Sequence, residues 1–176
     1  SRTKYKTFAG TLSGVGTLLS ANPLVLFGLK LIPALPMLNT PLIKVKIDTG
    51  AKTSALHAYD LEILEMSNKK YAKFVIHPLQ KNESITRCAI AEVIDSRVVR
   101  SSNGHKEERV VIRSPIKIGN HYWDIDITLT KRDIMRYRML LGREAMKSLL
   151  VNPGRSYCQG KVPSKKARLE YGNNYA

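Results

Sequence analysis

The chain has few acidic residues. Asp and Glu together number 14 against 29 Lys and Arg, so the formal net charge is +15 over 176 residues. This excess favours an anionic partner, which could be nucleic acid, a ribosomal surface, anionic lipid or an acidic peptide. The apolar fraction of 43% is ordinary for a globular protein and argues against wholesale disorder. The length predicts one domain with a single modest core.

Cysteine is also scarce, and the common cofactor motifs are missing. Cys88 and Cys158 lack the spacing of a metal site. They are therefore either two free thiols, the alternative that we favour, or a disulfide. The sequence contains no Gly-rich phosphate loop, no Gly-x-Gly-x-x-Gly, no His-Glu-x-x-His and no nucleophile elbow. The four histidines are scattered without metal-type spacing: His57, His77, His105 and His121. We therefore predict no cofactor and no metal site.

Residues 1–23 form a basic and moderately apolar leader. Arg2, Lys4 and Lys6 precede an uncharged run over residues 8–28. This pattern fits either the remnant of an export signal or a plain flexible leader, so the compartment stays open between bacterial cytoplasm and periplasm. Pro23 and the many Gly, Ser and Thr residues argue against a membrane-spanning helix, and we expect no integral membrane span.

Short runs with strand character follow the leader, separated by turn signals. They cover residues 24–27, 43–47, 53–57, 71–76, 85–94, 97–101, 109–113, 116–118, 122–129 and 138–141. Such spacing predicts an all-β domain, closed or sandwich-like. One segment, residues 143–151, has a helical apolar pattern that Pro153 and Gly154 end. We place the domain at residues 24–157, followed by a basic tail at residues 158–176.

The stretch KIDTGAKTSALHA, residues 46–58, places a carboxylate directly after a strand. Residues 44–47 alternate polar and apolar, which indicates a half-buried strand, and Asp48 stands where that strand should end. Asp is a poor strand former and Gly50 favours a turn, so the stretch alone is compatible with an ordinary turn. The remaining motifs decide whether Asp48 carries chemistry.

Two further segments bear on whether Asp48 lies in an ordinary turn or in a functional site. Residues 97–113 read as two β-rich arms around Asn103-Gly104, a pair that favours a tight type I′ turn. This is either an ordinary surface hairpin or one whose tip closes over a site. Later, the apolar residues Leu140 and Leu141 run into Gly142, and the predicted helix begins at once.

Taken in order, these pieces resemble a retropepsin-like aspartic protease. The strings LPMLN, KVKIDTGAKTSALHA, VVRSSNGHKEERVVI, DIDITLTKRDIMRYRMLLGREA and NPGRSY are similar to a bacterial family labelled "ATP-dependent zinc protease". The resemblance covers residues 24–157 and implies a closed retropepsin-like (acid protease) β-barrel with one short C-terminal helix. The sequence itself shows neither zinc ligands nor an ATP loop, so we follow its carboxylate chemistry rather than the label.

The resemblance also implies roles for particular residues. The catalytic group would be Asp48, Thr49 and Gly50. Its loop would be supported by Ala51, Leu140, Leu141 and Gly142. The flap and the substrate-binding residues would be Ser102, Asn103, Gly104, Arg109 and Arg143.

An aspartic protease needs two carboxylates that share a proton, and this chain has one Asp-Thr-Gly. The nearest second candidate, Asp95-Ser96-Arg97, has arginine in place of the glycine. A homodimer would supply the second Asp48 across a two-fold axis, as retropepsins do.

The excess of basic residues bears on the substrate. Six cations could flank a cleft that attracts an acidic peptide, or form a solvated face: Arg100, Lys106, Arg109, Arg132, Arg136 and Arg143. In the family that this chain resembles, the genes often neighbour an ATP-grasp ligase that adds glutamates to a ribosomal protein, which suggests a glutamate-rich substrate. Three functions remain open: a homodimeric aspartic endopeptidase, which we favour, a non-catalytic dimerisation or RNA- and ribosome-binding module, and a zinc hydrolase.

Overall fold

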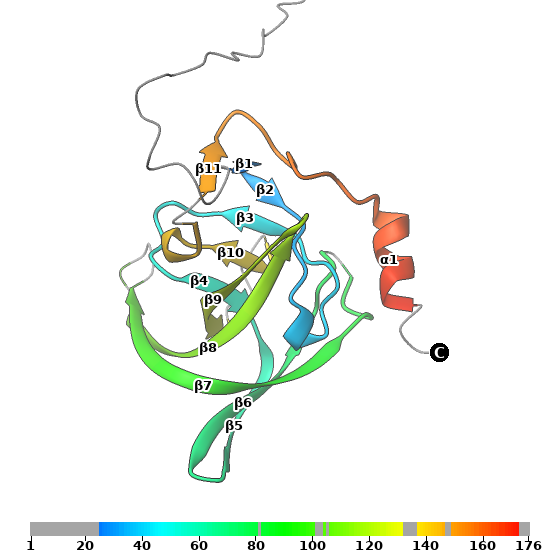
Figure 1. The fold of residues 1–176 in the computed structure, drawn as a ribbon. Helices are drawn as coiled ribbons and strands as arrows, with labels where there is room; N and C mark the ends of the chain where they lie inside the picture. The colour runs from blue at the N-terminus through cyan, green and yellow to red at the C-terminus, as the bar shows by residue number, and fades with distance from the viewer. Residues whose placement is uncertain are drawn as a thin grey trace, which may run out of the picture.

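The part of the protein that the structure describes is mostly β, with one short α-helix near its C-terminal end (Figure 1). The computed structural model describes residues 25–80, 82–100, 104, 106–131, 137–146 and 149–172. The first part of the chain contains β1 (Val25–Gly28), β2 (Lys30–Leu31), the 3₁₀ helix η1 (Pro36–Leu38), β3 (Val45–Ile47), β4 (Ser54–His57), β5 (Tyr59–Met66) and β6 (Lys69–Ile76). The rest contains β7 (Arg87–Arg100), β8 (Lys106–Ile118), β9 (His121–Thr130), β10 (Met139–Leu141), the 3₁₀ helix η2 (Arg143–Met146), β11 (Leu149–Asn152) and α1 (Ser164–Gly172). The predicted leader, residues 1–23, lies outside the described part.

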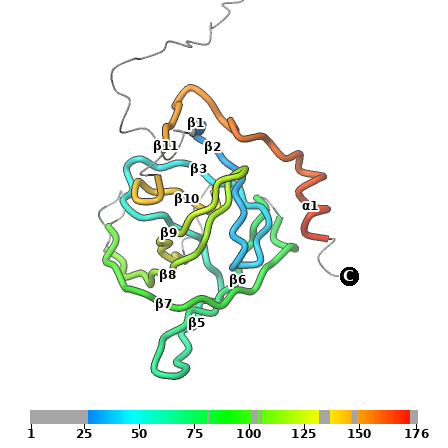
Figure 2. The backbone as a smooth tube through the Cα atoms, viewed as in Figure 1, coloured from blue at the N-terminus to red at the C-terminus, as the bar shows by residue number. Residues whose placement is uncertain are grey.

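Nine strands form one open sheet in the order β2-β3-β10-β4-β9-β8-β7-β6-β5. The prediction of a closed barrel was therefore wrong, because the end strands β2 and β5 do not pair with each other. The two-residue strand β2 offers little backbone for closure. At the other end, the β5–β6 hairpin projects away from the body of the domain (Figures 1 and 2).

The long strands explain how the sheet bends strongly without closing. Residues 87–92 of β7 pair with β6, whereas residues 93–100 pair with β8. The register shifts between Val93 and Asp95, where the strand changes partner. A bulge of this kind increases local twist and bends the strand. Figure 1 shows β7 as a long arc around the lower side of the molecule.

The predicted helix at residues 143–151 is also wrong. Its first four residues form η2, and β11 follows and pairs in parallel with β1 in a separate two-stranded sheet. Leu149, Leu150 and Val151 are apolar residues that suit a strand as well as a helix, and β1 supplies the pairing partner. The α-helix is α1 instead, and it lies in the segment predicted as a tail.

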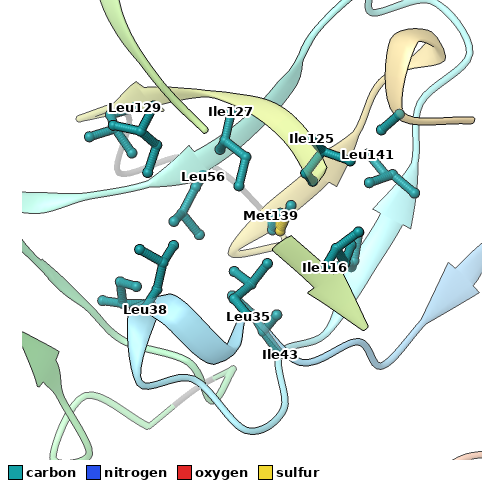
Figure 3. Packing of buried hydrophobic residues seen from close by; sticks show 14 of the residues in the cluster. Leu35, Leu38, Ile43, Leu56, Ile116, Ile125, Ile127, Leu129, Met139 and Leu141 are labelled. Carbon is teal, nitrogen blue, oxygen red and sulfur yellow. The ribbon is translucent and has the colours of Figure 1, made fainter. Parts of the chain in front are cut away.

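The core is continuous between the strands and η1. Figure 3 shows Leu35 and Leu38 facing side chains from β8, β9 and β10. Val45 and Ile47 of β3 are also buried, whereas Lys46 between them is exposed. This alternation is the one predicted from the sequence, and it fixes the direction in which residues before and after β3 point.

Tyr171 anchors α1 to the domain. Its hydroxyl donates to the Leu42 carbonyl and accepts from the Leu42 N–H at 3.4 Å. The Arg87 guanidinium lies over its ring at 4.8 Å, and Arg87 Nη2 donates to the Tyr171 carbonyl at 2.9 Å. Burial raises the pKa of Tyr171, and the Leu42 and Arg87 contacts only partly offset this effect. α1 is thus held against the sheet by a buried phenol.

Two sequence expectations can be compared directly with the described residues. Cys88 and Cys158 are free thiols, with Cys88 exposed, as favoured from the sequence. Within this part of the chain, no helix has the length and apolar character needed to cross a membrane.

Candidate active site

Asp48 lies at the end of β3 with its carboxylate held by the backbone that follows it. Asp48 Oδ1 accepts hydrogen bonds from the N–H groups of Gly50 at 3.0 Å and Ala51 at 3.3 Å. Oδ2 accepts none of the hydrogen bonds found among the described residues. Short polar side chains commonly fold a loop in this way. The loop therefore orients one oxygen and leaves the other available, with Thr49 and Gly50 exposed beside it.

The predicted supporting strand does lie beside this loop. β10 pairs in parallel with β3, with Leu140 opposite Lys46 and Leu141 opposite Ile47. The ladder continues past the strand end, where the Asp48 N–H donates to the Leu141 carbonyl at 2.9 Å. The position of Asp48 is thus fixed by strand pairing from a segment more than ninety residues later in the chain.

Gly142 is the point of closest contact between these segments. A Cβ at this position would lie 2.5 Å from the carbonyl carbon of Thr53 and 2.7 Å from its oxygen. Both are backbone atoms, so no side chain can move aside. The Gly142 N–H also donates to Ser54 Oγ at 3.2 Å. The sequence Leu140-Leu141-Gly142 therefore ends in glycine because the backbone after Asp48 leaves no room for a side chain.

Arg143 braces the Asp48 loop from outside. Its Nη1 donates to the carbonyl oxygens of Thr49 at 2.8 Å and Gly50 at 3.1 Å. Its backbone N–H donates to Ala51 at 2.9 Å. Arg143 was predicted to bind substrate, and in the structure its Nη1 contacts the carbonyl oxygens of the loop itself.

Arg97 was missed as a site residue and joins the β7–β8 hairpin to the Asp48 loop. Its Nη1 donates to Thr53 Oγ1 at 3.0 Å, and its Nη2 to Asp126 Oδ2 at 3.0 Å. Glu144 Oε2 lies 3.5 Å from Nη1 and accepts from Thr53 Oγ1 at 3.2 Å. Arg97 Nε donates to Asp95 Oδ2 at 2.8 Å. The two charged residues of Asp95-Ser96-Arg97 therefore form an ion pair with each other within this network.

The same network sets the pKa values of two carboxyl groups. Partial burial alone would raise the pKa of Asp126, but hydrogen bonds from Arg113 and Arg97 outweigh it and hold that pKa below 3.8. The side-chain bond from Arg97 and the N–H of Ser96 lower the pKa of Asp95. Both carboxyl groups are therefore anionic at neutral pH and serve as partners of arginine.

The predicted hairpin is present. β7 and β8 pair in antiparallel fashion from Arg97 opposite Arg109 to Arg100 opposite Lys106. Gly104 is exposed with φ +81°, a conformation that favours glycine. Ser102 and Asn103 lie outside the described residues, so their part in a flap stays a prediction. Arg132 and Arg136 lie outside them as well.

Arg109 is not a free substrate-binding cation in this structure. Its side chain is 7% exposed, and its guanidinium donates twice to Glu107 Oε2, at 2.9 and 2.8 Å. Across the hairpin, Arg100 and Lys106 are exposed. Of the six cations considered from the sequence, only these two project freely from the described hairpin arms.

Two of the histidines pack against one tyrosine ring. His57 stacks on the Tyr59 ring at 4.2 Å, and His77 meets the edge of the same ring at 4.2 Å. Among the described residues, no three His, Cys, Asp or Glu side chains are grouped closely enough to hold a metal ion. The titratable group that the Asp48 loop itself positions is the Asp48 carboxylate, held by two backbone N–H groups.

Comparison with solved structures finds the same fold in a protein of Legionella pneumophila. Protein Lpg0085 of Legionella pneumophila, of unknown function (DUF785), superposes with a TM-score of 0.65. The alignment covers 77% of this chain and 98% of that chain at 23% sequence identity, and it shows a shared fold.

Curated relatives contain a closely similar segment within longer chains. A protein of Shewanella halifaxensis is 42% identical over 140 residues, and one of Desulfotalea psychrophila is 39% identical over 138. Both are named "Probable alpha-L-glutamate ligase". The matched segment covers 79% and 77% of this chain, but only 31% and 30% of the relatives.

The family model of the retropepsin-like aspartic endopeptidase RimB matches residues 32–162, which include Asp48, the hairpin and Gly142. Its description names an aspartic rather than a zinc protease. The chain therefore belongs to the RimB-like family of retropepsin-like aspartic endopeptidases.

Proposed function

We propose that this protein is a homodimeric aspartic endopeptidase that cleaves acidic, glutamate-rich peptide. The observation that carries the proposal is the geometry of Asp48, whose Oδ1 is held by two backbone N–H groups at the end of β3. Strand pairing with β10 and the contacts of Arg143 hold the loop in place. Such preorganisation is what a catalytic carboxylate requires.

The second carboxylate comes from a second copy of the chain. No hydrogen bond joins Asp48 to another carboxyl group among the described residues, and Asp95 is engaged by Arg97. Thr49 and Gly50 are exposed at the surface that a partner would cover. A two-fold axis beside this loop would bring the two Asp48 side chains together and leave Thr49 to brace the loop across the axis.

The pair of Asp48 carboxyl groups would share one proton, because two negative charges at such short range cannot both form easily. The ionised carboxylate removes a proton from water, and the oxygen of that water attacks the peptide carbonyl carbon. The protonated carboxyl group donates to the carbonyl oxygen. Collapse of the tetrahedral intermediate breaks the C–N bond, and the leaving amine takes up a proton. The apparent pKa values of this reaction belong to the pair.

The β7–β8 hairpin would act as the flap. By the family resemblance Ser102, Asn103 and Gly104 would form its tip, and glycine at φ +81° suits a tip that changes conformation. Arg97 ties the base of this hairpin to Thr53, next to the catalytic loop. Arg100 and Lys106 extend from its arms and could attract carboxylate side chains of a substrate, whereas Arg109 and Arg143 support the structure around them.

Two observations support a glutamate-rich substrate. The net charge of +15 favours an anionic partner. In addition, longer relatives that contain a segment similar to this chain are named "Probable alpha-L-glutamate ligase", which supports a link between this family and glutamate-rich peptide. An enzyme that removes glutamates would be the natural counterpart of one that adds them.

The test compares the parent protein with Asp48→Asn on glutamate-rich peptides. Asn retains the size and hydrogen-bonding capacity of Asp but cannot titrate. Asp60→Asn is the matched control, because Asp60 is exposed at φ 48°, where Asn is equally tolerated. We expect cleavage by the parent and by Asp60→Asn, loss of cleavage in Asp48→Asn, and no effect of a chelator. Equal cleavage by all three proteins would contradict the proposal, and inhibition by chelator would favour a metal hydrolase.

A further inference from the structure

A pocket lies between α1 and the start of β3, away from the Asp48 loop. Its volume is about 330 Å³, which falls within the range of ligand-binding pockets. α1 lies beside the sheet and is reached from β11 by a long connecting segment (Figures 1 and 2). That segment is fixed to the sheet, because the Tyr157 N–H donates to the Lys30 carbonyl at 2.8 Å. The pocket is thus bounded by anchored elements on both sides.

The charged residues that line the pocket are all cations. Lys44, Lys161 and Arg168 are among its lining residues, and no Asp or Glu is. No ion pair joins any of these three to a carboxylate within the described ranges. Their charge is therefore not neutralised locally, and an anionic ligand would meet a positive potential.

Two of these cations contact the same aromatic ring, that of Tyr157. The Lys44 ammonium lies 5.8 Å from the centre of the Tyr157 ring, and the Lys161 ammonium 6.0 Å. Lys44 is also 6.0 Å from the Tyr137 ring. Cation–π contacts of this kind favour defined positions for the ammonium groups without neutralising them. Apolar lining from Leu79 and Pro163 adds surface for the aliphatic part of a side chain.

The pocket is connected to Asp48 along β3. Burial alternates strictly from residue 43 to residue 48, so Lys44, Lys46 and Asp48 share the side that faces away from the core. Four residues of extended chain span about 13 Å. The face also includes Lys30, the cross-strand partner of Lys46. A line of cations therefore leads from the pocket toward the catalytic loop.

We propose that this pocket is a subsite for acidic peptide, which holds a glutamate-rich stretch of the substrate at a distance from the cleaved bond. The choice of acidic peptide as the ligand rests on the proposed function, whereas the location of the subsite and its cations are those of the pocket. The occupant is peptide rather than nucleic acid, because three cations on an apolar wall match carboxylates on short aliphatic stems. The subsite would lower the concentration of acidic substrate needed for half-maximal cleavage.

The test measures binding of fluorescein-labelled hexaglutamate to the full chain carrying Asp48→Asn, so that binding is read without cleavage. Lys161→Ala and Arg168→Ala should each weaken binding about fivefold, and the double variant about twentyfold, with smaller differences at high salt. Lys166→Ala is the matched control, because this substitution also removes one positive charge from the protein. Lys166 is exposed on α1 and does not line the pocket. Thermal unfolding verifies that each variant is folded.

The outcomes separate this inference from the proposed function. Equal binding by the pocket variants and the Lys166→Ala control would overturn the subsite, even where the parent cleaves glutamate-rich peptide. Selective loss of binding in the pocket variants would support the subsite, even where no cleavage is seen. Binding of a single-stranded RNA that depends on Lys161 and Arg168, without binding of hexaglutamate, would also overturn it.

Discussion

Replacing Gly142 with alanine tests how tightly the Asp48 loop is packed. An added Cβ would lie 2.5 Å from the carbonyl carbon of Thr53 and 2.8 Å from the carbonyl oxygen of Lys52. Ordinary van der Waals contact begins at 3.4 Å. The segment around Gly142 and the segment at Lys52 and Thr53 must therefore separate by about 0.9 Å. No side chain can relieve the overlap, because both neighbours are backbone atoms.

This separation would also break hydrogen bonds between the segments. Arg143 N–H donates to Ala51 at 2.9 Å and Glu144 N–H to Lys52 at 3.0 Å. Lengthened by the same amount, neither would remain a hydrogen bond. Each lost hydrogen bond costs about 1 kcal/mol, and the steric overlap costs about 1–3 kcal/mol. Alanine also lowers the conformational entropy of the unfolded chain, which stabilises the fold by less than about 1 kcal/mol. We expect a net loss of about 3 kcal/mol in the free energy of unfolding.

The assay is urea unfolding of the parent, Gly142→Ala and Gly172→Ala. Gly172 ends α1 with open space around it, so alanine there should be neutral or slightly stabilising. Gly142→Ala should also lose most cleavage activity, because Asp48 would move with the loop. A Gly142→Ala protein within about 0.5 kcal/mol of the parent, with full activity, would refute the packing argument.

Two further substitutions follow from the pKa values. Asp126→Asn should cost about 1 kcal/mol at neutral pH through its bonds to Arg97 and Arg113. The pKa of Asp126 is lower in the folded than in the unfolded state, so the difference from the parent should disappear as pH falls below 3.8, measured by urea unfolding across pH. Tyr171→Phe should cost about 1–2 kcal/mol by leaving the Leu42 carbonyl without its donor. Because burial raises the pKa of Tyr171, the parent should lose stability above pH 10.0 relative to this variant, whereas a constant difference across pH would contradict the assignment.

Local patterns predicted the segments around Asp48 well. The alternation before Asp48 gave β3, and the two β-rich arms around Gly104 gave the β7–β8 hairpin. Both signals depend on residues close together in the chain, where side-chain period and turn chemistry act directly. The position of Leu141 and Gly142 beside Asp48 was expected from the family resemblance rather than from any local pattern.

Local sequence patterns did not predict the features that depend on residues far apart in the chain. Residues 149–152 form a strand because residues 25–28 pair with them, and the apolar pattern alone also suited a helix. β5 was missed because its Glu, Leu and Met residues favour helix in isolation. Arg97 gained its role from contacts with Thr53 and Asp126, which lie far from it in sequence. The barrel prediction failed because whether two end strands meet is a property of the whole sheet.

The proposed dimer requires that each active site contain Asp48 from two copies of the chain. Mixing parent and Asp48→Asn protein in equal amounts, at constant total concentration and after time for subunit exchange, tests it most directly. Random pairing leaves about one quarter of the dimers with two Asp48 residues, so this requirement predicts about one quarter of the parent's cleavage rate. A rate of about one half would mean that each chain acts with its own Asp48 alone, and would contradict the shared site.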